Sequence, residues 1–230
     1  MDGLMRRRGG QHKMQIDIVR QIPFSDLEAM IRRVPLKQKA EDGSEIFVYG
    51  GARISQHTFH PADVNPTTFY LLHKGLDFQE KLHGYLLREH GIDMLQLDGA
   101  VELHNRDTDQ VWTLTPPIVE VTPRTVRFVA QEGEIQCDAD VAIQIPIIMD
   151  GAHRVGLARR LGLPFASVFI AGADPRFPFY AHPNPWSMVC VVDEVPKHKR
   201  EKKLYSREDC YGLYRDFGVI GCGGPRSPSP

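Results

Sequence analysis

Residues 146–162 encode a strand, a tight turn and a helix, and this stretch limits the possible folds more than any other. It has the sequence PIIMDGAHRVGLARRLG. Its two isoleucines, 147–148, are β-branched and predict a buried strand. Asp150-Gly151 is a turn dipeptide, and an aspartate can also cap the helix that follows. Gly162 predicts the helix end, because a glycine there can adopt the left-handed conformation, and a proline two residues later prevents continuation.

The start of this helix is a candidate anion site. A helix N-terminus presents unpaired backbone N–H groups and a partial positive charge, which suit an anion. His153 and Arg154 lie in the first turn, where acidic residues are usual. Cations at that end make electrostatic sense when an anion is bound. We therefore expect phosphate groups to bind at Gly151, Ala152, His153 and Arg154.

The bulk composition is that of an ordinary globular protein. The 230 residues are 42% hydrophobic and 25% charged, with a net charge of −1. The charge gives no general indication of DNA or anionic membranes as partners, and no apolar run has the length of a membrane span. The four cysteines form no Cys-x-x-Cys pair, so we expect reduced thiols in a cytoplasmic protein, with no zinc site and no disulfide frame, at positions 137, 190, 210 and 222.

Helices are expected in three further segments. Ser25 and Glu28 have the spacing of a capping box, which predicts a short helix to about Arg33. An apolar stripe predicts a helix over 76–90 that Gly91 ends. A second box-like start predicts a terminal helix over 206–217.

Short apolar, β-branched runs predict the strands, and polar or Gly-rich ends predict disorder. A polar turn over 104–109 predicts a hairpin. The strands are expected at 46–49, 67–72, 94–102, 111–121, 125–130, 141–149, 165–170 and 187–192, with disordered ends at 1–13 and 219–230.

Three segments have both a functional and a plain interpretation. The loop 172–186 is rich in proline and aromatic residues, so it is either a substrate lid, with Tyr180, His182 and Trp186, or an aromatic plug over the edge of the core. His57 and His60 lack a third ligand, which favours surface histidines over a metal site. The basic run 197–203 is typical of a solvated loop.

The central motif resembles the ParB/sulfiredoxin superfamily. The resemblance rests on Asp150-Gly151-Ala152-His153-Arg154, on the preceding apolar strand at 117–119 and on the helix end at 158–162. It implies an α+β fold, a compact mixed sheet with flanking helices, to which this chain adds an N-terminal β-rich extension. Residues 111–218 would form the core with its C-terminal helix, and residues 14–110 the extension and the first part of the α/β domain.

The residues of the turn distinguish among the activities of this superfamily. Sulfiredoxins need a cysteine immediately before the histidine, where this chain has Ala152. Chromosome-partition ParB proteins carry a second arginine in place of His153 and continue into a helix-turn-helix domain. The turn is similar to the Asp-Gly-x-His-Arg turn of the free-serine kinases, which also use a glutamate early in the helix after the first strand. The comparable residue here is Glu80.

The resemblance therefore implies a small-molecule kinase that uses ATP, ADP or CTP with Mg²⁺ and a hydroxyl-bearing acceptor. His153 would donate to a phosphoryl oxygen and Glu80 would be the general base. Asp150 would bind Mg²⁺, orient the acceptor hydroxyl or only cap the helix. Two alternatives stay open: a ParB-like nucleic-acid-binding or nuclease module, and a nucleotide-sensing module without turnover. The sequence predicts no membrane partner and leaves the oligomeric state undetermined.

Overall fold

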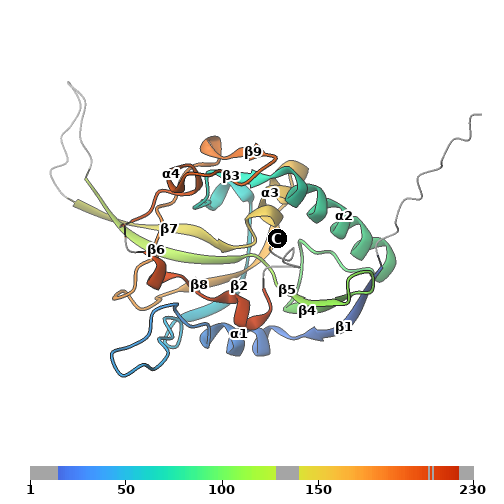
Figure 1. The fold of residues 1–230 in the computed structure, drawn as a ribbon, viewed down its shortest axis with the longest axis horizontal. Coiled ribbons are helices and arrows are strands. Elements are labelled where there is room, and N and C mark those ends of the chain that lie inside the picture. The colour runs from blue at the N-terminus through green and yellow to red at the C-terminus, as the bar shows by residue number, and fades with distance from the viewer. Residues whose placement is uncertain (1–14, 128–139, 207, 209, 223–230) are drawn as a thin grey trace, which may run out of the picture.

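The computed structural model describes residues 15–127, 140–206, 208 and 210–222. The fold is α+β, as expected, and its centre is a mixed four-stranded sheet (Figure 1). β6 pairs antiparallel with β7 and parallel with β8, and β2 pairs antiparallel with β8. In sheet order the strands are β2 (Arg53–Phe59), β8 (Phe165–Ala171), β6 (Ile118–Arg127) and β7 (Asp140–Asp150).

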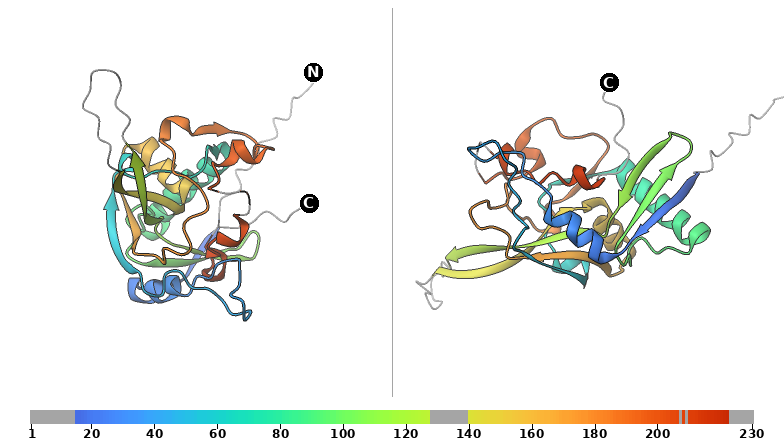
Figure 2. Two further views of the ribbon diagram at one scale, coloured as in Figure 1. Left: turned by 90° about the vertical axis from the view of Figure 1, so that its left-hand side faces the viewer. Right: turned by 90° about the horizontal axis from the view of Figure 1, so that it is seen from below.

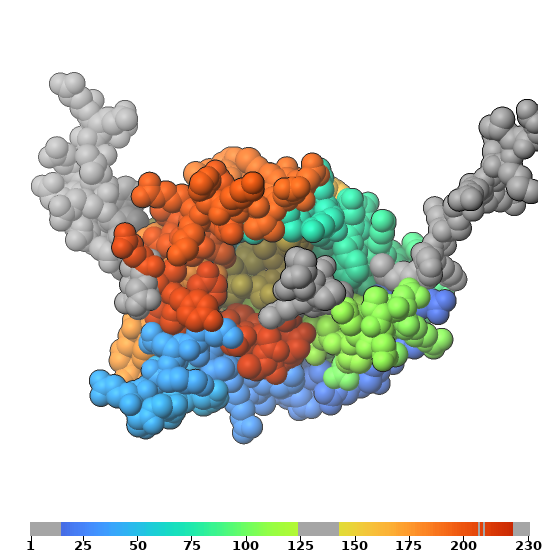
Figure 3. Space-filling model, viewed as in Figure 1, coloured from blue at the N-terminus to red at the C-terminus, as the bar shows by residue number. Residues whose placement is uncertain are grey.

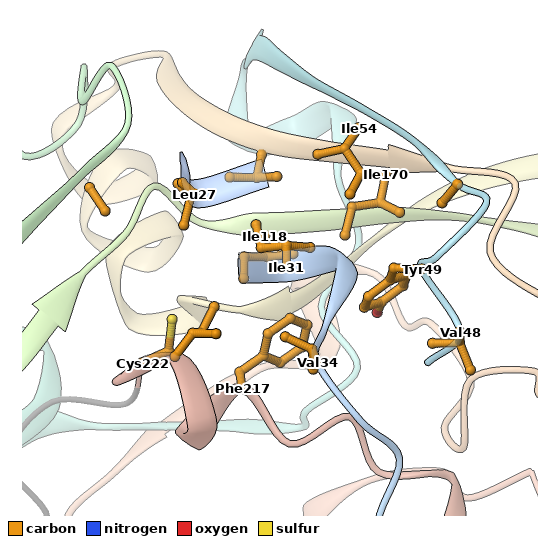
Figure 4. Close-up of a cluster of buried hydrophobic side chains, with 14 of the residues drawn as sticks. Leu27, Ile31, Val34, Val48, Tyr49, Ile54, Ile118, Ile170, Phe217 and Cys222 are labelled. Carbon is orange, nitrogen blue, oxygen red and sulfur yellow. The ribbon is translucent and has the colours of Figure 1, made fainter. Parts of the chain in front are cut away.

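Helices cover both faces of this sheet, because its inner strands carry apolar residues on both sides. On one face, Ile170 of β8 belongs to the same buried cluster as Leu27 and Ile31 of α1 (Phe24–Arg32) (Figure 4). On the other face, Phe165 packs with Val155 of α3 (Ala152–Leu161). Packing on both faces thus fixes the sheet, and with it the place where β7 ends and α3 begins.

A second sheet is built from residues of the N-terminal half. It has the order β1-β4-β5 and lies at the opposite end of the molecule from the β6–β7 pair (Figure 2). Its bounds are β1 (Ile16–Ile22), β4 (Ala100–Asn105) and β5 (Gln110–Leu114), and the expected hairpin joins the last two. Leu82 and Leu86 of α2 (His73–His90) pack against Leu103 and Trp112 of this sheet. α2 therefore lies between the second sheet and α3.

The remaining elements are short. β3 (Tyr70–Leu72) pairs parallel with β9 (Cys190–Val192). The last part of the described chain carries one short helix, α4 (Lys199–Lys202), in the basic run that was expected to be a loop. The 3₁₀ turns are η1 (Pro61–Asp63), η2 (Trp186–Met188), η3 (Tyr211–Leu213) and η4 (Phe217–Ile220). No described helix is both long and apolar enough to cross a membrane.

Two predictions near the N-terminus were wrong in detail. The helix expected after Ser25 is present, but it begins after Pro23 without a side-chain cap, and Glu28 pairs instead with Arg32 at 2.7 Å. The segment 46–49 is not a strand but a loop that leads into a turn; Val48 and Tyr49 are buried in the core below α1, Ile46 packs against them, and Phe47 is exposed. An apolar run is expected wherever side chains are buried, so this run did not require a strand.

The C-terminal predictions were also wrong. In the part of 206–217 that the structure describes, the expected helix is replaced by η3 and the start of η4, because Arg215 donates to the carbonyl oxygens of Leu213 and Phe177 and holds the chain in an irregular path. The first residues of the expected disordered tail, 219–222, are ordered instead, and Ile220 and Cys222 are both 7% exposed. The predictions for 1–13, 128–130 and 223–230 fall outside the described residues.

Candidate phosphate-binding turn

The predicted strand, turn and helix are confirmed, but the helix has no cap. β7 ends at Asp150, Gly151 is the N-cap with φ 85°, and no side chain accepts a hydrogen bond there. Of the three roles left open for Asp150, the structure therefore rules out the helix cap. The first backbone bond of the helix runs from the N–H of Val155 to the oxygen of Gly151 at 3.0 Å. Among the described residues, the N–H groups of residues 152–154 therefore have no partner.

Only a glycine fits at position 151. Its left-handed conformation disfavours other residues. A Cβ atom there would also lie 3.0 Å from the Cα atom of Pro117 and 2.9 Å from Nη2 of Arg154. The turn is thus pressed against the linker between β5 and β6, and that contact fixes the direction in which α3 begins.

Arg154 is a buried tether within this turn. Its Nη2 donates to Oδ2 of Asp150 at 2.8 Å, and its Nη1 donates to the carbonyl oxygen of Thr115. The arginine side chain is 8% exposed and the aspartate side chain 24%. The positive charge that we expected to face a phosphate is thus partly neutralised by Asp150, and an incoming phosphate would have to compete for it.

His153 binds the start of α2. Its Nε2 accepts a hydrogen bond from the backbone N–H of Leu72 at 3.0 Å. Burial lowers the pKa of His153 below its usual value, against the opposing effect of the Asp150 charge. A neutral ring that accepts at Nε2 carries its proton on Nδ1, so Nδ1 is the nitrogen that can donate to a ligand.

Glu80 lies outside the turn. Its carboxylate pairs with Nη1 of Arg160 at 3.0 Å, and its side chain is 54% exposed. Arg160 follows Ala152 by two turns of α3, a distance of about 12 Å along the helix axis. The neighbouring Gln79 points inward instead, with a buried Oε1 that has no hydrogen-bond partner in the described part of the chain. The structure therefore does not bring Glu80 together with Asp150 and His153.

The three residues of the proposed lid are held against the body of the protein. Tyr180 is 6% exposed and stacks on Tyr214 with 3.8 Å between ring centroids. Trp186 donates from Nε1 to the carbonyl oxygens of Pro61 and Val64, at 2.8 and 3.0 Å. His182 is half-buried, and its backbone N–H donates to a carbonyl oxygen of the segment that follows α4. For Tyr180 and Trp186, this arrangement fits the aromatic plug.

No sequence pattern indicated that Thr115 and Cys222 would flank the turn. The hydroxyl of Thr115 and the thiol of Cys222 are 3.5 Å apart. Burial, and then the charge of Asp150, raise the pKa of Cys222 to about 12, so this thiol stays protonated near neutral pH. In Figure 3 the dark yellow atoms of the region around β7 and α3 lie at the floor of a recess that the orange and red segments border.

The turn offers one carboxylate for a cation. The described residues contain no group of three or more His, Cys, Asp or Glu side chains placed to hold a metal ion. Mg²⁺ is usually held by one or two carboxylates, water and the phosphates of the substrate. Asp150 therefore fits a magnesium ion that arrives with a nucleotide, and does not fit a resident metal.

The site therefore belongs to an α+β domain in which a mixed sheet leads through an uncapped glycine turn into a helix over one of its faces. The chain belongs to the ParB CE domain family, whose model matches residues 26–192. The match includes the central sheet and α3. No curated protein and no solved structure matches the chain.

Proposed function

We propose that this domain binds the phosphate groups of a nucleotide at the N-terminus of α3. The observation that supports this most strongly is the uncapped helix start, where Gly151 leaves the N–H groups of residues 152–154 directed at one place. ATP, ADP and CTP all carry the phosphates that such a site recognises.

Each polar side chain of the turn has a role in this proposal. Nη2 of Arg154 passes from Asp150 to a phosphate oxygen, while Nη1 stays on the carbonyl oxygen of Thr115 and keeps the guanidinium in place. Asp150, released from the arginine, then faces the magnesium ion that accompanies the nucleotide. The Nδ1–H group of His153 donates to a phosphoryl oxygen. Bound Mg²⁺ would neutralise phosphate charge during transfer.

The chemistry that this arrangement supports best is phosphoryl transfer to a small molecule with a hydroxyl group. Phosphoryl transfer depends mainly on positioning and charge neutralisation, which the turn supplies. Because Glu80 pairs with Arg160 outside the turn, we assign the acceptor hydroxyl to Asp150 as well. One carboxylate oxygen would face the magnesium ion, and the other would orient the hydroxyl and accept its proton as the new O–P bond forms and the remainder of the nucleotide leaves with the oxygen of the broken P–O bond. Formation of a phosphorylated product by the wild type, and its loss in Asp150→Asn, would test the role assigned to Asp150.

A nucleotide-sensing module without turnover is the second candidate. It is favoured by the position of Glu80, since this carboxylate pairs with Arg160 outside the turn and is not placed to act as a separate base. Nucleotide binding with no phosphorylated product, even after long incubation with varied hydroxyl compounds, would support this candidate over the kinase.

The test is calorimetry with ATP, ADP and CTP in the presence of Mg²⁺, on the wild type and on Ala152→Asp. An acidic residue in the first turn stabilises a helix but repels a phosphate at the same place. We expect binding by the wild type, a folded variant and loss of binding in that variant. Ser44→Asp, which adds the same charge in an exposed loop, should bind as the wild type does. No binding of any nucleotide by the wild type would overturn the proposal.

A further inference from the structure

The basic run of the sequence lies on an aromatic cleft that is separate from the turn. The cleft has a volume of about 870 Å³ and is open to solvent. No residue of the 150–154 turn lines it. Three cations line it, from α4 and the residue after it: Lys199, Arg200 and Lys203. Three aromatic rings come from the segment that follows: Tyr205, Tyr211 and Tyr214.

The rings at the base of the cleft are held rigidly. Tyr214 stacks on the buried Tyr180 with centroids 3.8 Å apart, and Tyr205 lies beyond with a centroid distance of 6.2 Å from Tyr180. The backbone N–H and the hydroxyl of Ser206 both donate to the carbonyl oxygen of Tyr180. These bonds fix the cleft before any ligand arrives, which reduces the entropy cost of binding.

Tyr211 is the ring that remains accessible. It is 68% exposed, and its centroid lies 5.9 Å from that of Tyr214. A large exposed aromatic residue beside a fixed aromatic cluster offers a planar ligand a face on which to stack. A nucleobase is the common ligand of this kind, because every base has a π-face.

The cations supply the complementary charge. Among the described residues, none of Lys199, Arg200 and Lys203 forms an ion pair, whereas many other basic side chains of the protein do. Nζ of Lys203 binds Oγ1 of Thr67 at 3.1 Å and lies 5.2 Å from the centre of the Tyr180 ring. Of the lining residues that the structure describes, Glu208 is the acidic one. The cleft thus carries an excess of positive charge in a protein whose net charge is −1.

We propose that this cleft binds a nucleotide unit, with its base stacked on Tyr211 and its phosphate held by Lys199, Arg200 and Lys203. Positive grooves with interleaved aromatic rings are the usual arrangement for single-stranded nucleic acids. The same chemistry is present in a free nucleotide. The proposal does not depend on the function of the α3 turn.

The test is fluorescence anisotropy with a labelled oligothymidylate, together with calorimetry with thymidine monophosphate and with inorganic phosphate. Tyr211→Ala should weaken binding of the strand about tenfold, the usual effect of removing one stacking ring. The double variant Lys199→Ala/Arg200→Ala should weaken binding and reduce the slope of log affinity against log salt by about 1.4. Lys81→Ala, an exposed lysine of α2, is the matched control and should have no effect.

The outcomes distinguish a nucleic acid from a free nucleotide as the ligand, and the cleft from the α3 turn as the site. Binding of the strand without the mononucleotide assigns the cleft to nucleic acid, and equal binding per nucleotide assigns it to free nucleotides. Binding in both cases should persist in Ala152→Asp, which blocks only the α3 turn. Absence of binding, binding of phosphate as tight as that of the nucleotides, or binding that neither cleft variant weakens would overturn the proposal.

Discussion

The imidazole of His153 occupies the space that a side chain at position 75 would need. A Cβ atom on Gly75 would lie 2.5 Å from both Cδ2 and Nε2 of the histidine. The same Nε2 accepts the hydrogen bond from Leu72, so the close approach of α2 and α3 at this glycine positions the ring. The orientation of a candidate phosphate-binding residue therefore depends on a residue of another helix.

Gly75→Ala should destabilise the protein by about 1–3 kcal/mol and weaken nucleotide binding. The new methyl group collides with a ring that is itself held, and such overpacking has this cost. Gly84→Ala is the control in the same helix: its Cβ would meet only the flexible end of Arg88, and the change should stabilise by up to about 1 kcal/mol. Thermal unfolding measures both. Equal effects of the two substitutions would contradict the role assigned to Gly75.

Arg154→Ala should destabilise the fold by about 3–5 kcal/mol, since it leaves the partly buried Asp150 carboxylate without its partner. Loss of nucleotide binding in this variant is therefore informative only under conditions where it stays folded. Arg159→Ala, one turn further along α3 and exposed, should cost no more than about 1 kcal/mol, the usual value of its cation–π contact with Trp186. Urea unfolding compares the two.

Tyr49→Phe should destabilise the protein by about 1–3 kcal/mol. The hydroxyl of Tyr49 donates to Oε2 of the buried Glu120 at 2.8 Å, and burial raises the pKa of this glutamate above its usual value. Without the hydroxyl, a buried carboxylate oxygen loses its donor. Tyr211→Phe, on an exposed ring, should leave the free energy of unfolding unchanged. A negligible effect at Tyr49 would mean that the carboxylate finds another donor.

Lys203 should make the free energy of unfolding rise with pH above about pH 8. Burial lowers the pKa of Lys203 from 10.5 to about 8. Between those values the unfolded chain binds a proton that the folded chain has lost, so this residue makes stability rise with pH. Other groups have raised pKa values and therefore make stability fall with pH above about pH 9–10, among them Tyr180, Tyr214 and Cys222. A variant that changes only Lys203 keeps all of these groups, so their effect cancels when it is compared with the wild type.

Lys203→Met isolates this effect. The stability difference between wild type and variant should shift in favour of the wild type from pH 7.5 to pH 9.5. The basic and acidic neighbours of the lysine in the cleft are unchanged in this comparison: Lys199, Arg200 and Glu208. A difference that is constant with pH would show that Lys203 keeps an ordinary pKa. Thermal melts across the range provide the measurement.

Glu80→Gln should leave nucleotide binding and any phosphoryl transfer unchanged. Its side chain is exposed and its partner is Arg160, so the change should alter stability by no more than about 0.5 kcal/mol. Asp150→Asn is the contrasting variant, because it alters the carboxylate within the turn. A large loss of product formation in Glu80→Gln, with binding intact, would return the role of general base to Glu80.

Some local elements could be predicted because their signals lie within a few residues. The end of α3 at Gly162 and the end of α2 at Gly91 follow from glycine in the left-handed conformation, and both predictions are confirmed. Capping was less predictable: Ser25 and Asp150 are good capping residues by type, but neither caps its helix. Whether such a side chain turns to the backbone depends on what else it meets, and Asp150 meets Arg154.

By itself, the sequence determined the strand, the turn and the helix around Gly151, since these depend on dihedral preferences and on the period of apolar residues. Only the tertiary structure decided what surrounds that turn. Cys222 and Thr115 lie more than a hundred residues apart in the chain and meet beside it, and Glu80 faces away from it. Such contacts arise when whole helices and strands pack against the two sheets, and this packing cannot be predicted from any short segment of sequence.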